Sequence, residues 1–190
     1  INCSWGDHGG QLPGLHTSAL EDAIDNALTW GRSGKGCVVV FAAGNEAPAM
    51  DYPGTFDDRI ITVGSIGNTG VRSTFSGYGT KLDVVAPGEN IMTTYPNYMS
   101  GLASATSMAT PHVSGIAALA LSYALDNGIK LTNTELYDIL ASSVRNIDDQ
   151  LTGSKPIYAG YEAYGNLNLN SYKGKMGTGK IDALMTIMNV

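Results

Sequence analysis

The sequence predicts an α/β protein with a mainly parallel sheet that is covered by helices. Apolar runs rich in β-branched residues, such as residues 37–45, are typical of strands buried on both faces. These runs alternate with segments of helical periodicity, and a strand–helix–strand succession favours parallel pairing. The length of 190 residues fits one domain with a sizeable core, and the 24 glycines fit sharply turning connections.

Four strands are expected in the first half of the chain. Each is an apolar run, and the fourth is stopped by Pro87, which lacks the N–H that a sheet ladder needs. The runs are residues 1–5, 37–45, 59–66 and 82–88.

Capping residues mark two of the expected helices. Ser18 with Glu21, and Thr132 with Glu135, have the spacing of a capping box, in which each side chain binds a free backbone N–H. The expected helices span residues 18–30, 106–126, 131–144 and part of 177–188.

The segment of residues 151–176 has no clear periodicity and is rich in Tyr, Asn and Gly. We expect a loop insertion on the surface, followed by a closing segment over residues 177–190. No repeat or linker divides the chain, so residues 1–190 are interpreted as one domain.

Composition excludes several functions. The net charge of -6, without a cluster of Lys or Arg, argues against nucleic-acid binding. No uninterrupted apolar run reaches the roughly 18 residues of a membrane span. Cys3 and Cys37 are too few for a disulfide framework and are expected to be free thiols, with a single bridge as the alternative.

Ser107 is the first candidate for chemistry. It stands at the start of the apolar helix, at the positive end of the helix dipole, and its backbone N–H has no partner within the helix. Such an N–H can stabilise an oxyanion that forms beside the hydroxyl. The alternative is that Thr106 and Ser107 only cap the helix.

Two further stretches lie at the ends of the first two predicted strands. Ala42, Ala43 and Gly44 lead to Asn45, whose amide could donate a hydrogen bond to developing negative charge, although an Asn can also simply allow a left-handed turn. The other stretch is residues 4–6, an extended segment that could pair with a peptide or be an ordinary strand-to-loop transition. Ligands of such sheets bind where the strands end.

Together these stretches resemble the subtilisin-like serine proteases. Residues 104–119, "SATSMATPHVSGIAAL", are similar to the serine signature G-T-S-M-A-x-P-H-V-x-G, "VVVFAAGNE" to the oxyanion-asparagine strand, and "INCSWG" to the substrate strand. The stretches "YPG", "ITVGSI", "STFSGYG", "LDVVAPG" and "GTGKIDA" follow in the family's order. The resemblance covers about residues 1–145 and the end of the chain, and implies a three-layer subtilisin-like fold that here lacks its N-terminal strands.

The resemblance implies roles for individual residues. Ser107 would be the nucleophile, and Asn45 would donate to the oxyanion with the Ser107 N–H. The substrate would be contacted by a set of residues from three segments, namely Ser4, Trp5, Gly6, Ala42, Ala43, Gly44 and Thr106. Asp7 or Glu46 would favour basic substrates, as in the kexin-like branch.

No cofactor or catalytic metal is expected, although a structural Ca²⁺ or Na⁺ is conceivable because Asp83 matches a weak cation site of some family members. One departure from the signature is Ala105, which replaces the glycine before the Thr-Ser pair. If that position has φ > 0, alanine costs about 1 kcal/mol.

The larger departure concerns the rest of the triad. The family's Asp and His motifs precede the "SWG" strand and do not occur in this sequence. We therefore expect a serine endopeptidase domain whose Asp and His come from an upstream segment, and which is inactive as this chain alone because an unassisted serine is a poor nucleophile. The alternative is an inactive fragment or pseudoprotease that acts as a peptide-binding or assembly module.

The expected partners follow from this interpretation. They are a peptide or protein substrate and, at the edge of the first strand, the N-terminal segment of the same domain or a second chain, because Ile1, Cys3 and Trp5 would otherwise lose cover. Family members are usually secreted, so a secreted or cell-envelope location is expected.

Overall fold

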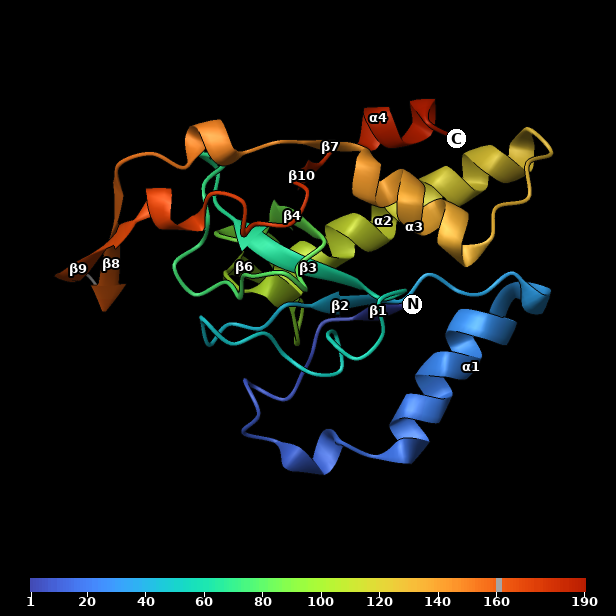
Figure 1. Cartoon of the computed structure of the whole chain (residues 1–190). Coiled ribbons are helices and arrows are strands. Elements are labelled where there is room, and N and C mark those ends of the chain that lie inside the picture. The colour runs from blue at the N-terminus through green and yellow to red at the C-terminus, as the bar shows by residue number, and fades with distance from the viewer. Residues whose placement is uncertain (160–161) are drawn as a thin grey trace.

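A computed structural model describes residues 1–159 and 162–190. Its centre is a six-stranded sheet in the order β1-β2-β3-β4-β10-β7, in which all pairs are parallel except β10 with β7 (Figure 1). The strands are β1 (Asn2–Cys3), β2 (Val40–Ala42), β3 (Ile61–Ile66), β4 (Val84–Pro87), β10 (Lys180–Ile181) and β7 (Val144–Arg145). The predicted α/β class with a mainly parallel sheet is confirmed.

Side-chain alternation along the strands builds three layers. Val40 faces α2 (Thr106–Asp126), α3 (Asn133–Ser142) and α4 (Ala183–Met188), in one apolar cluster with Val63 and Val84. Phe41 faces the other side and packs with Ile24 and Leu28 of α1 (Ser18–Gly34). Helices therefore cover both faces, as Figure 1 shows, and this explains why β3 is buried along its whole length.

The helices follow the predicted capping chemistry in one of two cases. At α3, Thr132 and Glu135 form the complete capping box. At α1 the N-cap is Thr17 rather than Ser18: the Thr17 side chain accepts a hydrogen bond from the Leu20 N–H, so the predicted cap is wrong by one residue. Short 3₁₀ helices complete the described elements: η1 (Pro13–Leu15), η2 (Asp148–Gln150) and η3 (Leu169–Tyr172).

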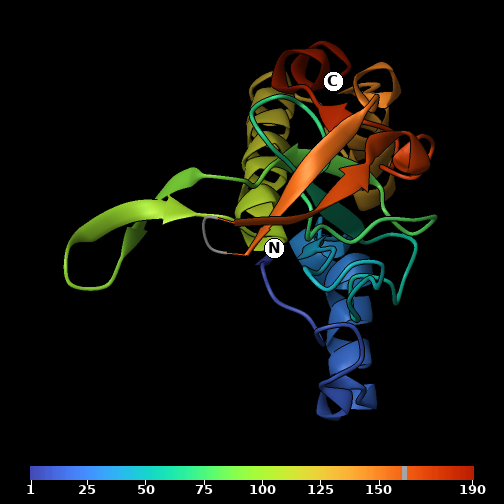
Figure 2. The same cartoon turned by 90° about the vertical axis from the view of Figure 1, so that its left-hand side faces the viewer.

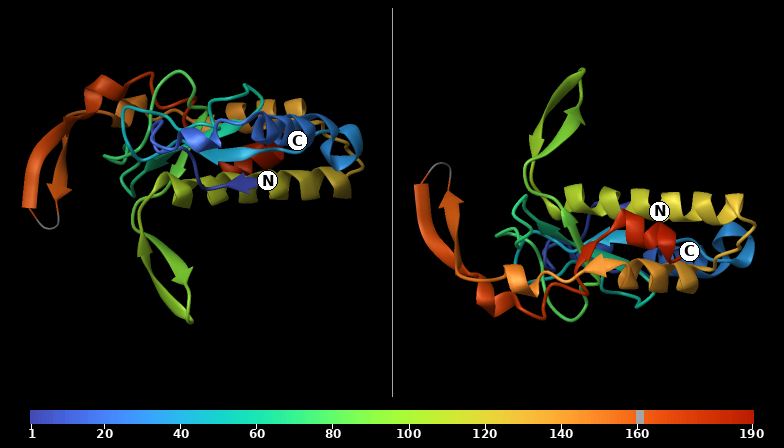
Figure 3. Two further views of the ribbon diagram at one scale, coloured as in Figure 1. Left: turned by 90° about the horizontal axis from the view of Figure 1, so that it is seen from below. Right: turned by 90° about the horizontal axis from the view of Figure 1, so that it is seen from above.

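Two antiparallel hairpins project from the body (Figures 2 and 3). One is β5 (Ile91–Tyr95) with β6 (Met99–Ala103), just before α2. The other is β8 (Ser154–Ala159) with β9 (Glu162–Asn168), in the segment predicted as a loop insertion. That prediction missed the strands because the half-buried face of the hairpin is not uniformly apolar, so the sequence shows no apolar alternation with a period of two. This face consists of Lys155, Ile157, Gly165 and Leu167.

Strand β1 lies at the edge of the sheet, as predicted for the first strand. Ile1 is 58% exposed and Trp5 43%, although Trp5 packs edge-on against Phe41. Cys3 is buried, contrary to the expectation that it loses cover, because α1 and Phe41 pack on it. Both cysteines are free thiols.

Helix α2 meets the length and composition of a membrane span, its most apolar 18 residues having a mean hydropathy of 1.2. Its Ser, Thr, Pro and His residues lower the mean only slightly, although they interrupt the apolar run, so the sequence still has no uninterrupted apolar stretch of span length. The helix packs against β2, β3 and β4, as the core helix of a globular domain does.

Candidate active site

The candidate nucleophile lies where the first two strands of the sheet end. Ser107 is in the first turn of α2, its hydroxyl donates to the backbone carbonyl of Ser4 at 3.0 Å, and the Ser4 hydroxyl donates to the Ser107 carbonyl at 2.9 Å. Ser4 comes directly after β1. This reciprocal pair fixes the start of α2 against the extended residues 4–6.

Asn45 is held on the other side of the same turn. Its Oδ1 accepts hydrogen bonds from the backbone N–H of Thr106 at 2.8 Å and from the Thr106 hydroxyl at 3.0 Å. The N-cap of α2 is Ala105, without a side-chain cap, so neither Thr106 nor Ser107 caps the helix. Asn45 takes that role from a distant part of the chain, and the left-handed residue of its turn is Gly44, with φ +96°.

Two hydrogen-bond donors remain free at the start of α2, where Ser107 lies. Among the described residues, neither the Ser107 backbone N–H nor the Asn45 Nδ2 donates a hydrogen bond. Because the atom that accepts from the Thr106 N–H must be the amide oxygen, the other terminal atom of the Asn45 side chain is the NH₂ group. A free N–H at a helix N-terminus and a fixed amide form the kind of donor pair that binds an oxyanion.

Ala105 has φ -171° and ψ 163°, an extended conformation that any residue adopts. Alanine at this position therefore does not carry the energetic cost of about 1 kcal/mol that a positive φ would impose. The turn at Ser107 forms without a left-handed residue immediately before Thr106.

The three histidines of the chain have other partners. His112 Nδ1 is 2.9 Å from the Met108 carbonyl on its own helix. His8 pairs with Glu46 at 3.3 Å, and His16 pairs with Asp7 at 3.0 Å while stacking on Tyr52. Within the described part of the chain, none of them is bonded to Ser107, so the residues present here supply no general base to its hydroxyl.

The predicted substrate-contacting residues gather around this point, with different exposure. Gly6 and Gly44 both lie against the side chain of Asp51 and are buried, as are Ala42 and Ala43, whereas Ser4 is half-buried and Trp5 is exposed. Thr106 is fully buried and reaches Asn45 rather than solvent. The sequence interpretation missed Asp51, which stands directly before the noted "YPG" stretch.

Carboxylates surround the same glycines. Burial opposes ionisation of Asp7, but hydrogen bonds from His16 and from the backbone of Tyr52 bring its pKa below the ordinary value. Burial raises the pKa of Asp51, and the charges of Glu46 and Asp7 raise it further. This corner of the site is therefore negatively charged and partly desolvated.

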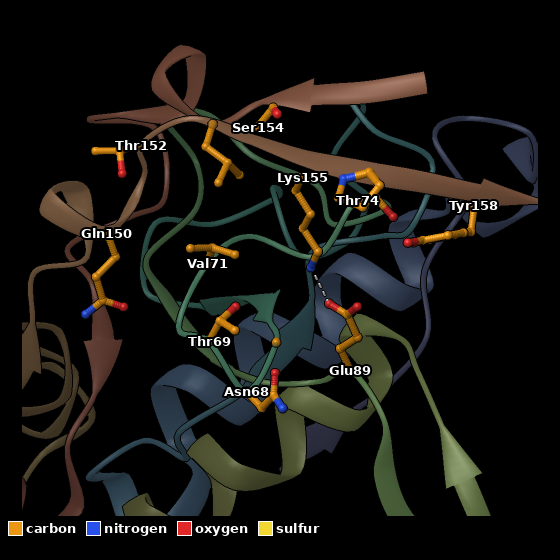
Figure 4. A pocket seen from close by; sticks show the side chains of 13 residues that line it. Asn68, Thr69, Val71, Thr74, Glu89, Gln150, Thr152, Ser154, Lys155 and Tyr158 are labelled. Carbon is orange, nitrogen blue, oxygen red and sulfur yellow. Dashed lines mark hydrogen bonds and ion pairs between the residues drawn. The ribbon is translucent and has the colours of Figure 1, made fainter. Parts of the chain in front are cut away.

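A cavity of about 530 Å³ lies elsewhere, under β8 (Figure 4). Lys155 and Glu89 form an ion pair of 2.6 Å inside it, as the dashed line shows. Its lining includes neither Ser107 nor Asn45. The cavity therefore does not belong to the candidate site.

The model of the subtilase family matches residues 1–172. The chain belongs to the subtilase family. Subtilisin DY of Bacillus licheniformis is 35% identical over 154 residues, which cover 78% of this chain and 50% of the relative. The major intracellular serine protease of Bacillus subtilis (strain 168) is 39% identical over 125 residues, covering 62% of this chain and 37% of the relative.

A solved structure gives the same fold. The prenylagaramide maturation protease PagA superposes with a TM-score of 0.71 and 25% identity, covering all of this chain and 61% of that chain. The subtilase chain described here thus spans half or less of these two curated relatives. One of them is named as intracellular, so the relatives leave the predicted secreted or envelope location open.

At the predicted cation site of this subtilase, both oxygens of the Asp83 carboxylate already accept hydrogen bonds. The Asp83 carboxylate accepts hydrogen bonds from the Thr62 N–H at 2.7 Å and from the Tyr137 phenol at 2.5 Å. Lys81 lines the same pocket and pairs with Asp58. The described residues contain no group of three or more His, Cys, Asp or Glu able to hold a metal, and the structural cation stays a prediction.

Proposed function

We propose that this chain carries the nucleophile and the oxyanion-binding half of a subtilisin-type serine endopeptidase. The observation that supports this most strongly is the joint placement of the Ser107 hydroxyl, its free backbone N–H and the free Asn45 Nδ2 at one helix start. The catalytic Asp and His would come from a segment outside these 190 residues.

In the proposed reaction, the Ser107 oxygen attacks the carbonyl carbon of the scissile peptide bond. A histidine from the other segment takes the hydroxyl proton, which requires Ser107 to release its bond to the Ser4 carbonyl. The carbonyl oxygen becomes an oxyanion and accepts hydrogen bonds from the Ser107 N–H and Asn45 Nδ2. The protonated histidine gives its proton to the leaving nitrogen as the intermediate collapses, so a neutral amine departs and an acyl-enzyme remains, which water hydrolyses.

The substrate would run as an extended strand beside residues 4–6. Those residues follow β1, whose outer edge is unpaired among the described strands. The preceding segment of the domain, or a second chain, would cover this edge at β1 and bring the missing Asp and His.

The test is labelling by a fluorophosphonate, which reacts with a serine that a base has activated. The intact protein is treated with the probe, and its mass is measured under denaturing and non-denaturing conditions. We expect one probe on Ser107, no labelling after Ser107→Ala, and normal labelling after Ser104→Ala, because Ser104 accepts a hydrogen bond from Asn90 outside the site. Labelling elsewhere contradicts the proposal.

An inactive peptide-binding module is the second candidate, because the chain's own histidines all have other partners. Peptide binding by the intact protein without any labelling favours this candidate. Labelling at Ser107 excludes it.

A further inference from the structure

Three carboxylates lie beside the segments that flank Ser107, and in two of them both oxygens have partners within the protein. Asp7 accepts from the Tyr52 N–H through Oδ1 and contacts His16 through Oδ2. Glu46 contacts His8 through Oε1 and accepts from the Asn45 N–H through Oε2. Both oxygens of each of these carboxylates therefore already have one partner, and the sequence-based preference for Asp7 or Glu46 as the residue that selects basic substrates stays a prediction.

Asp51 is different. It is only 4% exposed, and its Oδ1 accepts a hydrogen bond from the Gly9 N–H at 2.8 Å. Its Oδ2 has no hydrogen-bond partner among residues 1–159 and 162–190. Oδ2 is not among the fully buried side-chain atoms without a partner, so this oxygen of an otherwise buried carboxylate is accessible and can accept a hydrogen bond from a ligand.

The position of Asp51 indicates what it faces. A Cβ added to Gly6 would stand 2.6 Å from Oδ2, and a Cβ added to Gly44 would collide with Oδ1. The carboxylate therefore lies between the two segments of the proposed substrate site. Each segment has a glycine where it lies against Asp51, so no side chain at Gly6 or Gly44 stands between the backbone and the carboxylate.

We propose that Asp51 makes this site specific for a lysine or arginine immediately before the scissile bond. This rests on the proposed function, since it needs a peptide held beside residues 4–6 with its carbonyl at Ser107. The cationic side chain enters between Gly6 and Gly44, and its ammonium or guanidinium group donates to the free Oδ2.

Charge and desolvation both favour this occupant. A cation supplies the missing partner and offsets the repulsion among Asp51, Asp7 and Glu46. A neutral side chain would leave the buried carboxylate unpaired, and an acidic one would add repulsion. A charge-assisted hydrogen bond of this kind corresponds to roughly 10- to 100-fold in affinity.

The test uses the Ser107→Ala variant of the intact protein, so that binding is measured without cleavage. Two peptides are compared by calorimetry, one with arginine before the scissile bond and one with citrulline, which has the same shape but no charge. We expect the arginine peptide to bind roughly 10- to 100-fold more tightly. Adding Asp51→Asn should remove most of this difference.

The control is Glu46→Gln, which removes a nearby negative charge while Asp51 keeps its free oxygen. We expect it to change the arginine preference less than about fivefold. Equal binding of the two peptides, or an arginine preference that survives Asp51→Asn, overturns the inference even if wild-type Ser107 is labelled. Failure of both peptides to bind overturns it too, and absence of Ser107 labelling separately overturns the proposed function.

Discussion

The phenol of Tyr137 donates a hydrogen bond to Asp83 at 2.5 Å and thereby ties helix α3 to the start of strand β4. Burial raises the pKa of Asp83, while this bond and the Thr62 N–H lower it. Burial and the Asp83 carboxylate raise the pKa of Tyr137 well above its ordinary value, so the phenol remains a donor. The link therefore stabilises the charged form of Asp83 in the folded state.

Tyr137→Phe is expected to destabilise the protein by about 1.5 kcal/mol at pH 7, because the Asp83 carboxylate loses a donor. Without it the folded-state pKa of Asp83 rises further above the unfolded value of 3.8. The folded state then binds the proton more readily, so the loss shrinks as pH falls through the raised pKa. Urea unfolding at pH 7 and at pH 4 measures both effects.

Tyr123→Phe is the control for this prediction, since Tyr123 lies on an exposed face of α2. It should change the free energy of unfolding by less than about 0.5 kcal/mol at either pH. A Tyr137→Phe loss of the same size at both values would contradict the charge-based explanation.

Asn45→Ala is expected to lower kcat of the intact protease by roughly 10²–10³-fold, which is about 2.7–4 kcal/mol of transition-state stabilisation. KM should change little, because Nδ2 would bind the oxyanion rather than the substrate carbonyl. Steady-state kinetics on a fluorogenic peptide measures this split. Asn26→Ala, on the exposed side of α1, should leave kcat unchanged, and a purely KM-based defect in Asn45→Ala would argue against an oxyanion role.

Thr132→Ala should cost about 1 kcal/mol of unfolding free energy. The change removes the side-chain acceptor of the Glu135 N–H in the capping box of α3, whose Leu136 and Leu140 are fully buried in the core. Thr134→Ala, at an exposed position two residues on, serves as the matched control. Equal losses in the two variants would mean that the cap contributes nothing beyond helix propensity.

The elements that the sequence predicted well have strong local signals. The α3 capping box and the buried run of β3 each depend on residues close together in the chain, so spacing alone identifies them. The start of α2 was located for the same reason, but its cap was not, because Asn45 is 61 residues from Thr106 in sequence.

Asp51 shows the same limit at the candidate site. Nothing in its immediate neighbours indicates that its carboxylate lies between Gly6 and Gly44, since both glycines come close only through the parallel pairing of β1 and β2. From the sequence, Asp7 and Glu46 looked equally suitable as the carboxylate that selects basic substrates. Only the three-dimensional structure shows that their oxygens already have partners.

Gly6→Ala gives a steric test of the same arrangement. Gly6 does not have a positive φ, so alanine is allowed there by the backbone, but its Cβ would stand 2.5 Å from the Asp51 Cβ. Because such a contact cannot be kept, Asp51 must move, and we expect a loss of about 1–3 kcal/mol in unfolding free energy together with a weaker arginine preference.

Gly14→Ala is the matched control: its Cβ would meet nothing within 4 Å, and stability and preference should both stay unchanged. Urea unfolding and the arginine–citrulline comparison measure the two effects. If Gly6→Ala behaved like Gly14→Ala in both, the Asp51 side chain would not lie against Gly6.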